Sequence, residues 1–123
     1  MAAFRYIVSD LESAAAFYRD KLGFKIDMQV PGQFAALSRD NLTLYLNVPG
    51  QGSAGKAGGN PEPGGWNRFS IETDDLDALI GELEGNGASF RGEIASGPGG
   101  RQRLVEDPSG NVIELFERAK ADA

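Results

Sequence analysis

The chain has 123 residues, of which 41% are hydrophobic and 24% are charged, a composition typical of one soluble globular domain. The net charge of −6 and the lack of any Lys- or Arg-rich run argue against nucleic-acid binding, which requires a basic face. The sequence contains neither cysteine nor histidine, which excludes disulfides, thiolate chemistry and the commonest metal ligands. Any metal site would have to be built from oxygen ligands.

The chain shows no sign of a membrane partner. No apolar run approaches the roughly 18 residues that cross a bilayer. Residues 1–5, MAAFR, lack the apolar segment of a signal peptide. Because the chain also lacks cysteine, we expect a cytoplasmic protein.

The first part of the chain predicts the element order β-α-β-β-β. Residues 3–8 have the apolar character of a strand, and Ser9 with Glu12 fits a capping box at the start of a helix. Gly23 marks the end of that helix. Its apolar face consists of Leu11, Ala14, Ala15, Tyr18 and Leu22, which recur at helical spacing. Three strands are predicted next: 24–30, half-buried through Phe24, Ile26, Met28 and Val30, then 33–39 and 42–48.

Residues 49–65 interrupt this pattern with the glycine- and proline-rich run PGQGSAGKAGGNPEPGG. Such a composition buries too little apolar surface to order itself. The segment is either a flexible linker or a lid over a ligand, and the sequence leaves both interpretations open.

The second part of the chain predicts the same order of elements. A strand at 68–73 leads to Asp74, a favourable helix N-cap, and Gly87 marks the helix end. We interpret Asp107 as part of a tight turn rather than as a catalytic acid. The remaining strands are predicted at 88–94, 102–106 and 111–117, followed by a frayed tail at 118–123.

The two halves are copies of one module. Asp10-Leu11 aligns with Asp75-Leu76 at an offset of 65 residues. We therefore predict an α+β fold, with two βαβββ modules in a single domain that covers 1–123. Module 1 spans 1–48, the linker 49–65, module 2 66–117 and the tail 118–123.

Strand alternation places arginines on the sheet face away from the helices. Each helix covers one face of its own sheet, and the apolar residues of the first strand in each module are expected to meet it. The opposite face then carries Arg5, Arg68 and Ser70. A partly buried arginine requires a partner from the protein or from a ligand.

Three stretches resemble the vicinal oxygen chelate superfamily, which includes glyoxalase I, bleomycin-resistance proteins and extradiol dioxygenases. They are VSDLESAAAFYRDKLGF, TDDLDALIGELEGNGASF and EDPSGNVIELFE, and with the repeat they cover nearly the whole chain. The resemblance implies an open, cup-shaped mixed sheet with helices on its outer face, and a homodimer.

Metal-using members of that family place four ligands symmetrically, two in each module. The resemblance carries these positions to Ala3, Leu44, Arg68 and Glu114. Alanine and leucine offer no donor, and arginine is a permanent cation, so one carboxylate remains. The sequence thus resembles the metal-free, bleomycin-resistance-like branch, with no metal and no cofactor. Metal-dependent glyoxalase or dioxygenase activity is not expected.

Several side chains are candidates for a ligand site. Arg68 and Glu114 are expected to lie close together, either to orient a ligand or as an ion pair in a vestigial site. Trp66 is either an aromatic platform or an anchor for the preceding loop. The apolar candidates are either a cleft floor or plain core. The predicted ligand-binding residues are Arg5, Phe34, Leu44, Leu46, Trp66, Arg68, Ser70, Gln102, Glu114 and Phe116.

The main functional hypothesis is a metal-independent protein that binds a small molecule, and it includes sequestration of an antibiotic or metabolite. The alternative is a metal-free lyase, isomerase or hydrolase of the same fold, with Glu114 as its candidate acid or base. A third hypothesis is an interaction module without a ligand. Other groups with acid–base chemistry are Tyr6, Tyr18, Tyr45 and Glu72.

Overall fold

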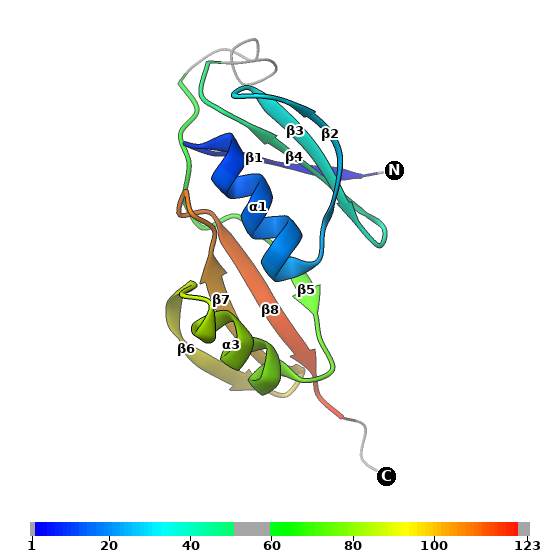
Figure 1. Ribbon diagram of the computed structural model, residues 1–123. Helices are drawn as coiled ribbons and strands as arrows, with labels where there is room; N and C mark the ends of the chain where they lie inside the picture. The colour runs from blue at the N-terminus through cyan, green and yellow to red at the C-terminus, as the bar shows by residue number, and fades with distance from the viewer. Residues whose placement is uncertain (1, 51–59, 121–123) are drawn as a thin grey trace. The chain divides into compact units, whose positions relative to one another are not determined.

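The computed structural model describes residues 2–50 and 60–120, which divide into two compact units. The first unit contains Met1–Gly65 and Asp107–Asn111, and the second contains Trp66–Glu106 and Val112–Ala123. Within the described residues, each unit has one helix and a four-stranded sheet (Figure 1). The predicted α+β class and the two βαβββ modules are therefore confirmed. No described helix is long and apolar enough to cross a membrane.

Two predictions fall partly outside the described residues. Residues 51–59 of the predicted linker and 121–123 of the predicted tail are among them. The choice between a linker and a lid therefore stays open. The cup-shaped arrangement of the two modules also stays a prediction.

The sheet of the first unit has the strand order β1-β4-β3-β2. Strand β1 runs parallel to β4, and the other neighbours are antiparallel. Helix α1 covers one face (Figure 1), and the core lies between them, with Leu37, Leu44 and Leu46 fully buried. The elements are β1 (Ala3–Ile7), α1 (Leu11–Leu22), β2 (Lys25–Val30), β3 (Phe34–Arg39) and β4 (Leu42–Asn47).

The sheet of the second unit repeats this order as β5-β8-β7-β6. Strand β5 is parallel to β8, as β1 is to β4. Helix α3 buries Leu76, Ile80 and Leu83, and Phe69 and Leu115 are among the buried apolar residues of the strands. The elements are β5 (Arg68–Glu72), α3 (Leu76–Gly85), β6 (Ser89–Gly97), β7 (Gly100–Glu106) and β8 (Val112–Arg118).

The aspartate of the repeat is the N-cap of both helices. The Asp10 carboxylate accepts from the backbone N–H of Ser13 at 3.3 Å, and Asp75 accepts from Ala78 at 3.0 Å. An N-cap side chain satisfies a free backbone N–H of the first helical turn, and the carboxylates of Asp10 and Asp75 do this here. The predicted capping box from Ser9 and the predicted cap at Asp74 are therefore both wrong by one residue.

A bulge in β2 changes which side chains face the core. Ile26 pairs with Leu37, but Met28 pairs with Ala36, so the register shifts between them. One extra residue reverses the alternation of side chains beyond it. Met28 and Val30, expected on the half-buried face with Ile26, instead lie on the face away from α1 and are 53% and 39% exposed.

The turn at 107–111 joins β7 to β8 in sequence but packs as part of the first unit. The buried Asp107 carboxylate accepts from the backbone N–H groups of Ser109 and Asn111 at 2.8 and 2.9 Å. It also accepts from the Tyr18 hydroxyl at 2.9 Å and from the Asn111 side chain at 3.0 Å. The predicted structural role of Asp107 as a turn residue is confirmed, and the turn also serves as a buried anchor.

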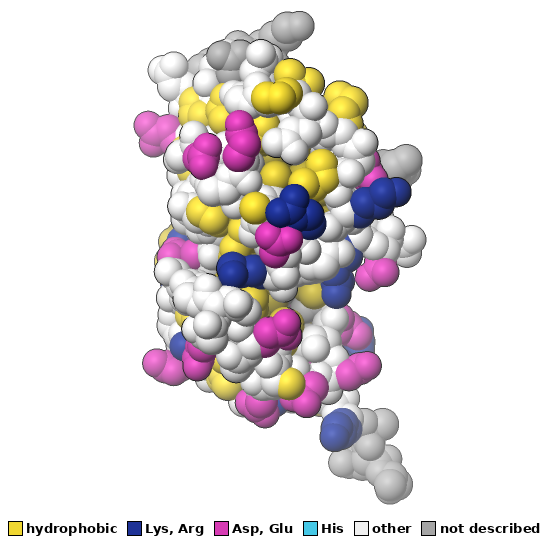
Figure 2. Space-filling model, viewed as in Figure 1, with side chains coloured by type: hydrophobic (Ala, Val, Ile, Leu, Met, Phe, Trp, Pro, Cys, Tyr) yellow, Lys and Arg dark blue, Asp and Glu magenta, His cyan; other side chains and the backbone are white. Residues whose placement is uncertain are grey.

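Charged side chains are mixed over the surface. On the face shown in Figure 2, acidic and basic groups are interspersed, and neither forms a continuous patch. This matches the local pairing of arginines with carboxylates, for example Arg101 with Asp77 and Glu117 at 3.0 Å each. Exposed pairs of this kind contribute little to stability.

Candidate functional site

The face of the second sheet away from α3, here called the open face of the second unit, gathers most of the predicted polar candidates. Phe69 and Leu115 are buried residues of β5 and β8, and side chains alternate along a strand. Ser70 pairs with Glu114 in the register between these strands. Both residues therefore lie on the open face.

Arg68 and Glu114 form an ion pair on this face. Nε of Arg68 donates to Oε1 of Glu114 at 3.1 Å, and both side chains are partly exposed. A second guanidinium nitrogen of Arg68 donates to the backbone oxygen of Trp66 at 3.4 Å. The predicted proximity of Arg68 and Glu114 is confirmed.

Trp66 presents an exposed aromatic ring that stacks on a cation. The residue is 66% exposed. The guanidinium carbon of Arg91 lies 4.4 Å from the centroid of the indole, within the range of a cation–π contact. Arg91 is itself held by Glu106 at 2.6 Å, so the platform has a fixed backing.

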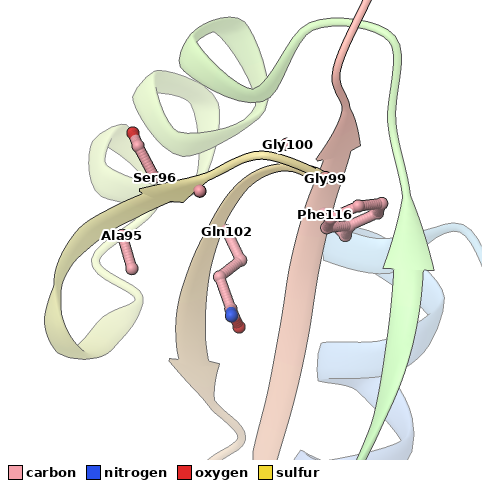
Figure 3. Close-up of a pocket in the computed structure, with 7 residues that line it drawn as sticks. Ala95, Ser96, Gly99, Gly100, Gln102 and Phe116 are labelled. Carbon is pink, nitrogen blue, oxygen red and sulfur yellow. The ribbon is translucent and has the colours of Figure 1, made fainter.

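A pocket of about 260 Å3 lies at the β6–β7 end of the second unit. Gln102 pairs with Ala95 on one side and Phe116 on the other, so these three residues share one cross-strand row. Figure 3 shows these side chains around the pocket. The predicted candidates Gln102 and Phe116 are thus brought together. The pocket is lined by Ala95, Ser96, Gly97, Gly99, Gly100, Gln102 and Phe116.

Two predicted site residues lie in the core. Leu44 and Leu46 are fully buried, on the same strand face as the core residue Tyr6, with which Leu46 pairs. Phe34 lies on the opposite face of the first sheet, because it pairs with Asn47 while Ala35 pairs with Leu46. The four apolar candidates therefore do not share one surface.

The strand register also corrects one equivalence between the modules. Ser70 pairs with Glu114, and the corresponding residue Arg5 pairs with Tyr45. Tyr45, not Leu44, is therefore the counterpart of Glu114. The expected equivalence of Leu44 with Glu114 is therefore wrong by one residue, because strand pairing and not the position of the preceding turn sets which residues correspond.

Two of the candidate acid–base tyrosines are inaccessible. Tyr6 and Tyr18 are buried. Burial and the neighbouring Asp107 raise the pKa of Tyr18 well above its ordinary value. A hydroxyl group that is buried and held in its neutral form is unsuited to proton transfer with a ligand.

Sequence reasoning missed two residues, Arg91 and Asn47. Arg91 lies under Trp66, and Asn47 lies on the face of the first sheet away from α1, as Tyr45 does. The position of Asn47 follows from the alternation of β4 once Leu44 and Leu46 are assigned to the core. Arg91 has no signal in the sequence, because its contact with Trp66 is not local.

The residues present do not fit the divalent metal that metal-using members of the family hold. Among residues 2–50 and 60–120, no group of three or more Asp, Glu, His or Cys is placed to hold a metal ion. The carboxylate of Glu114 is already bound by the guanidinium of Arg68. A cation next to a permanent positive charge and a single carboxylate would lack ligands.

Comparison with known proteins identifies the family. The model of the Glyoxalase/Bleomycin resistance protein/Dioxygenase superfamily matches residues 1–115. No curated protein sequence matches the chain significantly.

Solved structures give the same result. A glyoxalase/bleomycin resistance protein from Streptomyces sp. CB03234 is 30% identical, with a TM-score of 0.65 and coverage of 93% of this chain and 96% of that one. TnmS3, an antibiotic binding protein from the same organism, is 29% identical, with a TM-score of 0.72 and coverage of 95% and 93%. Lactoylglutathione lyase from Agrobacterium tumefaciens shares the fold at 24% identity, with a TM-score of 0.76 and coverage of 95% and 92%. The chain belongs to the Glyoxalase/Bleomycin resistance protein/Dioxygenase superfamily.

Proposed function

We propose that this protein binds a small molecule, such as an antibiotic or another metabolite, through its own side chains and without a metal. The observation that carries the proposal is the open face of the second unit. This face holds the pocket at Gln102 and Phe116 and, outside the lining of that pocket, the exposed indole of Trp66 over Arg91. A concave site with apolar walls and a few polar groups is the usual form of a small-molecule site.

The comparisons support this proposal. TnmS3, to which the chain is 29% identical over 95% of its length, is an antibiotic binding protein. The Arg68–Glu114 ion pair further supports metal independence, because it occupies the one carboxylate that the family's ligand positions retain in this chain. An exposed aromatic platform favours a ligand with a flat ring system.

The single tryptophan of the chain provides a direct test. A panel of antibiotics that includes bleomycin is titrated against the protein while the fluorescence of Trp66 is followed. We expect at least one member to change the fluorescence saturably, with equal affinity before and after treatment with EDTA. Chromatography with mass detection should recover the bound antibiotic unchanged.

A matched pair of variants tests the site. Gln102→Ala removes an amide from the pocket and should weaken binding about tenfold, because a buried ligand group would lose its hydrogen bond. Gln29→Ala alters an exposed glutamine of β2 in the first unit and should leave binding unchanged. Equal loss in both variants, or no loss in either, would contradict the proposed site.

The same experiment separates binding from catalysis. The Arg68–Glu114 pair holds a carboxylate on the open face, where an enzyme of this fold could use it as an acid or base. Chemical change of the recovered ligand, abolished by Glu114→Gln, would replace the binding proposal with that activity.

We further propose that the protein is a homodimer. Native mass spectrometry of the same sample measures the mass of the assembly, and a monomer mass would contradict this proposal.

A further inference from the structure

Arg5 differs from every other arginine in its partners. Its guanidinium donates to Oδ1 of Asn47 at 2.7 Å, and its central carbon lies 4.9 Å from the centroid of Tyr45. Among the described residues, no carboxylate pairs with it. Each other arginine lies within 4.0 Å of an aspartate or glutamate oxygen, namely Arg19, Arg39, Arg68, Arg91, Arg101, Arg103 and Arg118.

This exception is informative because the chain is acidic. The net charge of −6 means that carboxylates are abundant, and each of the other arginines forms an ion pair with one. Arg5 instead contacts a neutral amide and an aromatic ring, neither of which compensates its charge. Its charge is therefore available to an anion that the chain does not supply.

Asn47 provides an unused donor beside Arg5. The residue is 1% exposed, and its Nδ2 has no hydrogen-bond partner among the described residues. The contact from Arg5 to Oδ1 fixes which end of the amide is the donor. A buried donor without an acceptor is costly, and a ligand oxygen would satisfy it.

The surroundings of this pair are apolar on one side. Strand pairing places Arg5, Tyr45, Ala36 and Met28 in one cross-strand row, and Ile7, Asn47, Phe34 and Val30 in the next. The donors therefore lie on β1 and β4. The apolar side chains of β2 and β3 continue the same face, and Met28 and Val30 are exposed there.

We propose that this face of the first unit binds an organic carboxylate. The carboxylate accepts from the guanidinium of Arg5 and from Nδ2 of Asn47, and the apolar body of the ligand lies over Phe34 toward Met28. Because neighbouring strands are about 4.8 Å apart, the face from β1 to β2 is about 14 Å wide. A ring system with a short carboxylate arm fits that span. The inference goes beyond the proposed function, because it assigns a ligand of stated chemical class to residues of the first unit.

The test is a titration of 15N-labelled protein with 1-naphthaleneacetate, followed by nuclear magnetic resonance. We expect saturable shifts of the Arg5 Nε–H and Asn47 side-chain amide signals. The neutral analogue 1-naphthaleneacetamide should bind at least tenfold more weakly, because a charge-assisted hydrogen bond is lost. Equal affinity for the two compounds, or no saturable shift at Arg5, would overturn the proposal.

Variants give the test a second arm. Asn47→Asp keeps the shape of the side chain but supplies Arg5 with a carboxylate, so binding of 1-naphthaleneacetate should fall at least tenfold. Arg5→Gln, at an exposed position, should have a similar effect without disturbing the core. Arg39→Gln, which removes an arginine already paired with Asp40, is the control and should leave binding unchanged.

The outcome also separates this inference from the proposed function. If antibiotics still change the fluorescence of Trp66 while 1-naphthaleneacetate leaves Arg5 unshifted, the carboxylate site is wrong and the binding function stands. If neither probe binds, both proposals fail.

Discussion

Tyr18 places a hydroxyl group in the core of the first unit, within hydrogen-bond distance of Asp107. The side chain is fully buried, and the hydroxyl donates to Oδ2 of Asp107 at 2.9 Å. The residues are 89 positions apart in the chain. The bond therefore ties helix α1 to a turn that belongs, in sequence, to the other half of the molecule.

Removal of that hydroxyl should destabilise the protein. Tyr18→Phe leaves a buried carboxylate one hydrogen bond short, which typically costs about 1–3 kcal/mol. Urea denaturation measures the change. Tyr45→Phe is the matched control, because the Tyr45 hydroxyl has no hydrogen-bond partner among the described residues, and it should change stability by less than about 0.5 kcal/mol.

The same variant should alter the response to alkali. The pKa of Tyr18 is raised in the folded state, first by burial and then by Asp107. Tyr18 is neutral in both folded and unfolded states below pH 10, its ordinary pKa. Above that pH the unfolded state loses the proton first, so stability falls by up to about 1.4 kcal/mol per pH unit. Tyr18→Phe should show a shallower decline than the parent between pH 10 and 11, and an identical slope would contradict this account.

At the scale of elements, Gly100 fixes the approach of β7 to β8. Its φ is +145°, and a Cβ at this position would collide with the backbone oxygen of Glu117. Only glycine permits this close approach of two backbones. The pocket wall at Gly100 therefore depends on the absence of a side chain.

We expect Gly100→Ala to separate β7 from β8 near Gly100 and to destabilise the protein by about 2 kcal/mol or more. Gly97→Ala is the control, because a Cβ there meets no atom within 4 Å, and it should be close to neutral. Thermal unfolding of the two variants provides the comparison. Equal stability of both would show that the β7–β8 contact relaxes freely.

The helices and strands were largely predictable from the sequence, but the pairing register of the strands was not. Apolar periodicity and the repeat at Asp10 and Asp75 are local signals, so they predicted the type of each helix and strand among the described residues. The bulge beside Ile26 has no glycine to mark it, and the strand equivalence of Tyr45 depends on pairing between distant residues. The same holds for the candidate site residues. Arg68 and Glu114 could be predicted from the repeat, whereas Asn47 and Arg91 were identified only from their contacts in the structure.

At the scale of the molecule, the compact units do not coincide with the halves of the sequence. The turn 107–111 belongs to the first unit. There its Asn111 side chain donates to the backbone oxygen of Ile7 at 2.8 Å and accepts from the backbone of Gly64 at 2.8 Å. Ser109 accepts from the backbone of Ser9 at 2.8 Å. The first repeat therefore depends on five residues from the second.

A fragment of residues 1–65 should consequently fail to fold, because Tyr18 and the backbone groups bonded to the turn would lack their partners. Amide proton dispersion in a nuclear magnetic resonance spectrum reports this directly. The control fuses residues 106–112 to the fragment through a glycine–serine segment and should recover dispersed signals. A fragment that is as well dispersed as the full chain would show that the turn is dispensable.

The bulge in β2 has a consequence for how such a protein can diverge. Before the bulge, Ile26 faces the same side of the sheet as the buried Leu37, with which it pairs. Side chains after it, Met28 and Val30, lie on the opposite face. One strand thus carries a segment that faces the core, followed by one that does not. Substitutions in the outer half of β2 should therefore cost little stability, and they would change the apolar part of the proposed carboxylate site without changing the core.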